Sequence, residues 1–139
     1  MRSYTLREHT ADVAVEADGA SPGAVFAAVA DGMAAAMADG EIPETGSRFT
    51  VSETAESLDA VLYDYLDRLI YERDVRGILP VDNEAEVSTS DDGEWTVEGS
   101  ARGVPLGDVD ARDLKAVTYS DMVVEEIDDG WHAYVVFDV

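Results

Sequence analysis

The sequence contains no cysteine, and its 139 residues include a single lysine, Lys115. Without cysteine, the chain forms no disulfide scaffold and no cysteine zinc site, and it has no thiol nucleophile. It also lacks a GxxxxGKS/T phosphate loop, a GxGxxG stretch after a strand and a serine nucleophile elbow. No apolar run approaches ~18 residues, and no basic region followed by an apolar one opens the chain. We therefore expect a cytoplasmic protein without a membrane span or secretory signal.

Arginine and lysine together are far outnumbered by acidic residues. Acidic residues number 31 against nine basic ones, eight of them arginine, and the formal charge is −22. The hydrophobic content of 46% is high enough for a folded core, so this charge does not predict disorder. Loss of lysine with gain of Asp and Glu is expected of a protein from a high-salt cell. Molar salt shortens the Debye length to ~3 Å and so screens the repulsion between acidic side chains. A chain without a basic stripe is not expected to bind nucleic acid directly.

Two segments with helical periodicity predict the helices. The first begins at Ser21-Pro22, with serine as the N-cap and proline in the first helical position, and it ends near Asp39-Gly40. The second has apolar residues at helical spacing, and we expect Ser52 or Thr54 to cap it. Its apolar stripe consists of Leu58, Val61, Leu62, Tyr65, Leu66, Leu69 and Ile70.

The rest of the chain predicts strands joined by tight turns. Asp91-Asp92-Gly93 and Asp128-Asp129-Gly130 each separate two strand-like runs, and Asp-Gly is a strong hairpin signal. The expected strands span residues 2–8, 13–17, 48–52, 84–90, 95–104, 122–127 and 131–139. The sequence therefore predicts one α+β domain over residues 1–139, with two helices packed on a mainly antiparallel β-sheet in the order β-β-α-β-α-β-β-β-β.

Carboxylates supply most of the chemistry that the composition offers. The two histidines, His9 and His132, are not at metal-pair spacing, so an oxygen-only site for a hard cation such as Ca²⁺ or Mg²⁺ fits better. With 31 acidic residues, composition alone selects no particular pair. Lys115 stands out because every other lysine is missing. It has either a specific role or no role beyond that of a surface residue.

Four stretches resemble the archease family, in the same order over essentially the whole chain. They are HTADV at 9–13, LDAVLYDYL at 58–66, LKAVTY at 114–119 and FDV at 137–139. Archeases are small acidic proteins that assist the RtcB-type GTP-dependent RNA ligase, which joins tRNA exon halves after intron removal. The resemblance implies a non-catalytic activator that promotes guanylylation and turnover of this ligase, its partner protein.

The resemblance also implies a set of site residues. Asp12 and Asp138 would supply carboxylates to a divalent cation, Ca²⁺ with Mg²⁺ as the alternative, and Val139 would add a main-chain oxygen because its terminal carboxylate is free. Lys115 matches the family's lysine and would act in the site or on the partner. The expected supporting residues are His9, Thr118 and Tyr119. Archeases commonly have histidine where this chain has Ser120, so an imidazole role does not carry over to that position.

Two other functions stay open at this stage. Asp12, Asp138 and Lys115 would also suit a metal-dependent hydrolase or phosphoryl-transfer enzyme. A chaperone-like modulator of another RNA-modifying enzyme is the third reading. The missing nucleotide motifs and the missing basic patch both favour the activator. Activity of the isolated protein on RNA or nucleotides would instead favour an enzyme.

Overall fold

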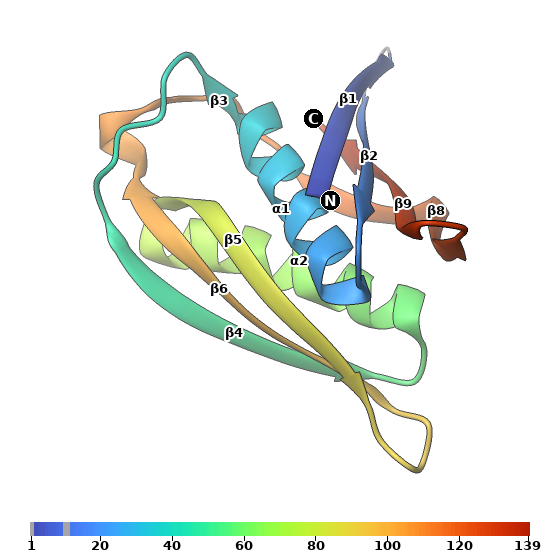
Figure 1. The fold of residues 1–139 in the computed structure, drawn as a ribbon. Coiled ribbons are helices and arrows are strands. Elements are labelled where there is room, and N and C mark those ends of the chain that lie inside the picture. The colour runs from blue at the N-terminus through green and yellow to red at the C-terminus, as the bar shows by residue number, and fades with distance from the viewer. Residues whose placement is uncertain (1, 10–11) are drawn as a thin grey trace.

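The computed structural model describes residues 2–9 and 12–139, and it places two helices between two antiparallel sheets (Figure 1). The helices are α1 (Pro22–Met37) and α2 (Leu58–Arg76). The strands are β1 (Arg2–His9), β2 (Asp12–Gly19), β3 (Ala38–Asp39), β4 (Ser47–Ala55), β5 (Ile78–Thr89), β6 (Trp95–Pro105), β7 (Asp110–Ala111), β8 (Ala116–Ile127) and β9 (Gly130–Asp138), with a 3₁₀ turn over Leu106–Asp108. The predicted α+β class and the order of the main elements are confirmed; β3 and β7 are short additions.

The strands divide between two larger sheets and one short pair. One sheet has the order β1-β2-β9-β8, the other β4-β6-β5, and β3 pairs with β7. All of these pairings are antiparallel. Because β9 inserts between β2 and β8, the last strand of the chain completes a sheet that the first two strands began (Figure 1). This non-local pairing places β2, from the start of the sequence, beside the last strand.

Helix α1 begins as predicted and ends slightly early. Ser21 accepts a hydrogen bond from the backbone N–H of Ala24 (3.1 Å), and Pro22 occupies the first turn. The helix stops at Met37 instead of near Asp39-Gly40, because Ala38–Asp39 leaves the helix to pair with β7. The helix is therefore tied to the second half of the chain at its C-terminal end.

Two glycines allow α1 to approach both sheets closely. A Cβ added at Gly23 would lie 2.3 Å from the carbonyl oxygen of Ala85 in β5. A Cβ added at Gly32 would lie 2.6 Å from Cγ1 of Val15 in β2. The helix contacts β1 and β2 on one side and β5 on the other, which explains why it is apolar nearly all round.

Helix α2 buries the apolar stripe that its sequence predicts. The buried members are Val61, Leu62, Tyr65, Leu66, Leu69 and Ile70, and Leu58 is partly buried. The predicted cap was wrong: Ser57, and neither Ser52 nor Thr54, accepts the capping hydrogen bond. The reason is that β4 continues to Ala55, in register with Trp95 of β6, so both earlier candidates lie inside a strand.

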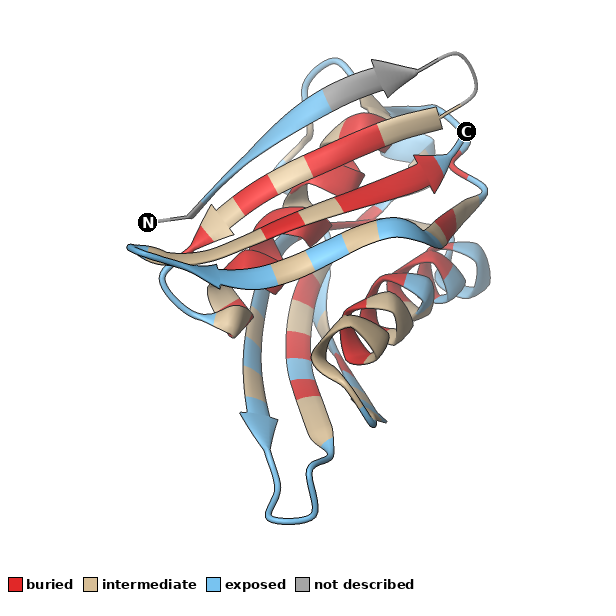
Figure 2. Cartoon of the chain, turned by 90° about the vertical axis from the view of Figure 1, so that its right-hand side faces the viewer, coloured by how far each residue is buried: buried red, intermediate tan, exposed pale blue. Residues whose placement is uncertain are grey.

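The core lies where the helices meet the inner faces of the sheets (Figure 2). Its largest fully buried side chains include Tyr65, Phe26 and Phe137, and the rings of Phe26 on α1 and Tyr65 on α2 are stacked with centroids 6.0 Å apart. Among the described residues, neither helix combines the length and hydropathy that crossing a membrane requires.

Candidate functional site

Two acidic residues from opposite ends of the chain are neighbours in the four-stranded sheet. The register of β1, β2, β9 and β8 puts His9, Asp12, Asp138 and Ala116 in one row across the strands. Directly opposed residues in antiparallel strands have Cβ atoms about 4.5–5.5 Å apart, with side chains on the same face. Asp12 and Asp138 therefore stand side by side, as a shared site requires. The side chain of His9, like residues 10–11 of the same motif, lies outside the described residues, so its supporting role stays a prediction.

One oxygen of this carboxylate pair is buried without a partner. Within the described part of the chain, Oδ1 of Asp12 is shielded from solvent and accepts no hydrogen bond. A buried acceptor in that state costs free energy, and like charges directly opposed across strands repel. A hard cation relieves both costs, because Ca²⁺ and Mg²⁺ bind carboxylate and carbonyl oxygens. The residues present therefore fit the divalent cation that the sequence predicts.

Such a cation would need oxygen ligands beyond side chains. The described residues include no group of three or more His, Cys, Asp or Glu side chains arranged to hold a metal ion. The ligands other than Asp12 and Asp138 would have to be main-chain oxygens and water. Val139, which follows β9 directly and is exposed, would supply the main-chain oxygen that the family resemblance implies.

Lys115 is anchored to the second carboxylate residue through the backbone. It lies in the segment just before β8, and its backbone N–H donates a hydrogen bond to the carbonyl oxygen of Asp138 (2.8 Å). Its side chain is exposed. The only lysine thus starts from a fixed point beside the Asp12–Asp138 pair and extends into solvent.

The two predicted supporting residues on β8 point to opposite faces of the strand. The Thr118 hydroxyl donates to the carbonyl oxygen of Val136 (3.0 Å), which holds β8 to β9 near the acidic pair. Tyr119 faces α2, where its ring centroid lies 5.4 Å from that of Tyr63. A hydrogen bond to Asp59 raises the pKa of Tyr119 above its usual range. Tyr119 therefore holds the strand to the helix and does not face the acidic pair.

Arg73, which is not among the predicted site residues, holds the segment leading to Lys115. Arg73 is buried near the end of α2, and its Nη1 donates to the carbonyl oxygen of Leu114 (2.7 Å). Its position, four residues after Leu69 and three after Ile70, continues the apolar stripe of the helix. The sequence does carry a signal for this role: an arginine on the apolar stripe of a helix is expected to be buried, and a buried arginine requires specific partners.

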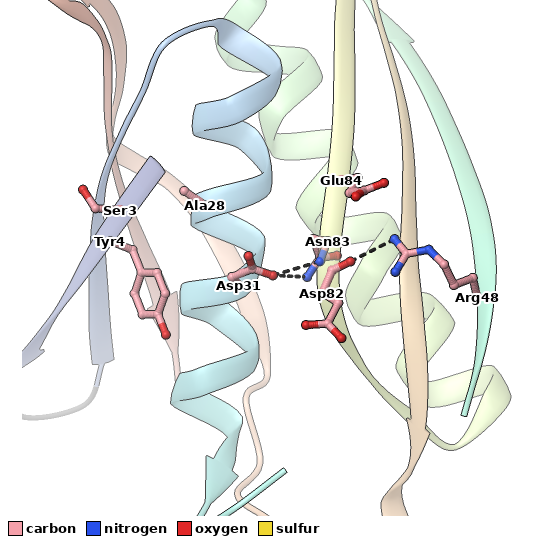
Figure 3. A pocket seen from close by; sticks show the side chains of 8 residues that line it. All are labelled: Ser3, Tyr4, Ala28, Asp31, Arg48, Asp82, Asn83 and Glu84. Atoms are coloured by element: carbon pink, nitrogen blue, oxygen red, sulfur yellow. Dashed lines mark hydrogen bonds between the residues drawn. The ribbon is translucent and has the colours of Figure 1, made fainter. Parts of the chain in front are cut away.

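A groove lies between β1, α1 and β5, and its lining does not include the acidic pair. It is a groove of about 640 Å³, and its lining includes Tyr4 on one wall, Asp31 on the floor and Arg48, Asp82 and Glu84 on the other wall (Figure 3). Asp31 accepts hydrogen bonds from the backbone and side-chain nitrogens of Asn83 (3.0 and 2.9 Å). The polar groups at its centre are thus bonded to one another across elements.

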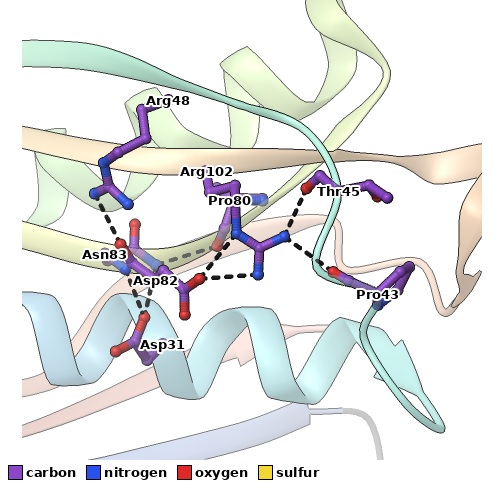
Figure 4. Close-up of polar contacts among 8 residues, drawn as sticks. All are labelled: Asp31, Pro43, Thr45, Arg48, Pro80, Asp82, Asn83 and Arg102. Atoms are coloured by element: carbon purple, nitrogen blue, oxygen red, sulfur yellow. Dashed lines mark hydrogen bonds and ion pairs between the residues drawn. The ribbon is translucent and has the colours of Figure 1, made fainter.

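The residues around Asp82 form a network of hydrogen bonds beside this groove. Asp82 has a positive φ of 49° at a register shift in β5, a strand that starts well before the predicted residue 84. Arg102 binds its carboxylate through Nε (2.9 Å), and Arg48 donates to its carbonyl oxygen (2.8 Å) (Figure 4). Arg102 also reaches the carbonyl oxygens of Pro43 and Thr45. This network stabilises an irregular strand and the loop before β4, so we assign it a structural role.

Comparison with known proteins agrees with the motifs in the sheet. The model of the Archease protein family (MTH1598/TM1083) matches residues 4–139. A protein archease from Thermococcus gammatolerans is 32% identical over 143 residues, and one from Pyrococcus furiosus is 29% identical over 143 residues. Both alignments cover 100% of this chain and 100% of the relative.

Two solved structures share the fold. The solution structure of Methanobacterium thermoautotrophicum protein 1598 has a TM-score of 0.79 and 27% sequence identity, with 98% of each chain covered. The crystal structure of a Thermotoga maritima archease, described as a possible chaperone, has a TM-score of 0.62 and 20% identity. That match covers 96% of this chain and 94% of the other, and it supports the fold alone.

Proposed function

The chain belongs to the archease family, and from this we propose that it is a non-catalytic, metal-binding activator of an RtcB-type GTP-dependent RNA ligase in tRNA splicing. In this proposal it acts in the cytoplasm through protein contacts and promotes guanylylation and turnover of the ligase. The observation that carries the proposal is the arrangement of three motifs at one end of one sheet. Asp12 of HTADV lies opposite Asp138 of FDV, and the amide of Lys115 in LKAVTY is bonded to Asp138.

The site residues have separate roles in this proposal. Asp12, Asp138 and the main-chain oxygen of Val139 would hold Ca²⁺ or Mg²⁺, which would supply positive charge between carboxylates that otherwise repel each other. Lys115 presents a compact charge from a fixed backbone position, suited to an acidic or phosphate group on the partner. Ser120, where archeases commonly have histidine, is exposed on an irregular part of β8 and has no role in the proposal.

Ligase assays with matched variants test the activator function. Purified ligase, GTP and RNA halves are combined with wild type, Lys115→Ala, Lys115→Arg or Asp12→Asn, and guanylylation and turnover are measured. We expect wild type to stimulate both steps and Lys115→Ala to lose most of the stimulation, on the order of tenfold. Lys115→Arg should substitute poorly, because the planar guanidinium differs in geometry from an ammonium. Circular dichroism and melting of each variant control for the fold.

Metal binding is tested separately from activation. In wild type, added Ca²⁺ should raise the melting temperature, by an amount that corresponds to about 2.7 kcal/mol at 100 times the dissociation constant. Asp12→Asn should lose this increase, yet melt no lower than wild type without metal, since it removes a like-charge contact.

Equal stimulation of the ligase by Lys115→Ala and wild type would refute the lysine's role. RNA or nucleotide turnover by the isolated protein would support the hydrolase or phosphoryl-transfer reading, and stimulation of a different RNA-modifying enzyme would support the chaperone-like one.

A further inference from the structure

We infer that Arg73 is a positioning residue for the Asp12–Asp138–Lys115 cluster, and that it acts through a single peptide group. The inference rests on the proposed function, because that proposal gives the cluster its role. Arg73 lies near the end of α2, only 8% exposed, and has no direct contact with the acidic pair among the contacts that the structure describes. Its effect on the cluster would therefore be indirect.

The partners of Arg73 come from three parts of the chain. Nη1 donates to the Leu114 carbonyl oxygen (2.7 Å) and contacts Sδ of Met37 at the end of α1 (3.1 Å). Nε and Nη2 bind Asp74 at 3.0 and 2.9 Å, and Nη2 lies 4.0 Å from Asp113. The rigid guanidinium thus fixes the segment before β8 against both helices.

One peptide plane joins Arg73 to the acidic pair. The carbonyl that accepts from Arg73 and the N–H that donates to Asp138 belong to the same peptide group, between Leu114 and Lys115. A trans peptide group is rigid and planar, so fixing its oxygen also fixes its N–H. A cation on the carbonyl oxygen also polarises the group and strengthens its N–H as a donor. The hydrogen-bonded path therefore runs from Arg73 through this plane to the carbonyl oxygen of Asp138.

The surroundings favour a strong effect. Leu114 is only 1% exposed and its hydrogen bond from Arg73 is buried, so losing this charged donor is costly. A second bond, from the Arg112 backbone N–H to the Met37 carbonyl oxygen (2.6 Å), holds the start of the same segment. Arg73 is the described side chain that holds the segment's last peptide group before β8. Its loss should therefore loosen the Lys115 end of the segment before the Arg112 end.

Because the chain has a single lysine, one backbone amide signal is enough to test the role of Arg73. Protein labelled with ¹⁵N only in lysine gives one backbone amide peak, that of Lys115, and its hydrogen exchange reports the bond to Asp138. Arg73→Met removes the donors but keeps much of the apolar stem. We expect this variant to speed hydrogen exchange of the Lys115 amide about tenfold or more. The increase is measured relative to the slowest core amides of a uniformly labelled sample. Arg76→Met is the matched control: Arg76 binds Glu72 and the Phe49 ring, and it should leave the Lys115 amide unchanged.

A milder variant keeps the test valid if Arg73→Met does not fold. Arg73→Gln retains a shorter donor and should give an intermediate exchange rate, whereas Arg73→Lys would add a second lysine signal. Exchange at Lys115 that changes only in proportion to the core amides, in whichever variant folds, would overturn the inference and make Arg73 a general stability residue.

The metal and ligase assays separate this inference from the proposed function. With Ca²⁺ alone as the probe, Arg73→Met should bind several-fold more weakly than wild type, and Arg76→Met should not. If wild type binds no Ca²⁺ or activates no ligase, the proposed function fails while the exchange result still decides the role of Arg73. If both functions hold but the Lys115 amide is unaffected in the Arg73 variants, the positioning role alone is refuted.

Discussion

At the scale of single residues, Glu72 shows how a charged group is held against α2 with little exposure to solvent. It is only 5% exposed, and its two carboxylate oxygens accept hydrogen bonds from Nε of Arg76 (2.5 Å) and Nε of Arg68 (2.8 Å). Arg68 also binds Glu53 of β4 (2.9 Å), so the network joins α2 to the three-stranded sheet. The hydrogen bond from Arg76, followed by that from Arg68, holds the pKa of Glu72 below its ordinary range against the opposing effect of burial.

This arrangement predicts how the stability contribution of Glu72 depends on pH. Because its pKa is lower in the folded state than the ~4.3 of an unfolded chain, the contribution is complete above that value and is lost as the pH falls through the folded pKa. Glu72→Gln should cost about 1.5–3 kcal/mol at pH 7, and the difference from wild type should shrink below pH ~4. Urea unfolding over this range measures it. Glu56→Gln, at an exposed position, is the control, and a pH-independent difference for Glu72→Gln would contradict the assignment.

At the scale of elements, the close approach of α1 to β5 leaves no room for an added methyl group. A methyl group at Gly23 would lie 2.3 Å from a backbone oxygen, which no side-chain rotation can relieve. Gly23→Ala should therefore destabilise the protein by about 1–3 kcal/mol despite the higher helix propensity of alanine. Gly107→Ala, where a Cβ meets nothing within 4 Å, should change the free energy of unfolding by less than ~0.5 kcal/mol. Equal melting temperatures for the two variants would show that α1 can shift away from β5.

At the scale of the whole molecule, local sequence patterns predict elements better than their partners. The 3.6-residue periodicity from Leu58 to Ile70 identifies α2, and the Asp-Gly turns identify two hairpins. The cap of α2 was wrong because Ser52 and Thr54 have the chemistry of a cap, and only pairing with β6 shows that they belong to a strand. The division into two sheets depends on contacts between distant segments, and local periodicity carries no information about these.

The candidate site shows the same limit. The positions of Asp12 and Asp138 within family motifs suggest a common role, and the β2–β9 register explains how residues from the two ends of the chain become neighbours. The place of Arg73 on the apolar stripe of α2 indicates a buried arginine, but the stripe does not identify its partner. That partner, the carbonyl of Leu114, lies 41 residues away along the chain.

The net charge of −22 is a property of the whole chain and predicts stability that depends on salt. In dilute buffer the acidic residues repel one another over the ~30 Å Debye length at 0.01 M, whereas molar salt shortens this to ~3 Å. The melting temperature should rise steeply from dilute buffer to molar KCl, measured with a chelator present so that the cation site does not contribute. Sucrose, which stabilises by exclusion from the surface without screening charge, is the control and should act more weakly. A melting temperature that is flat in KCl would rule out adaptation to high salt, because the acidic surface would then be stable without screening.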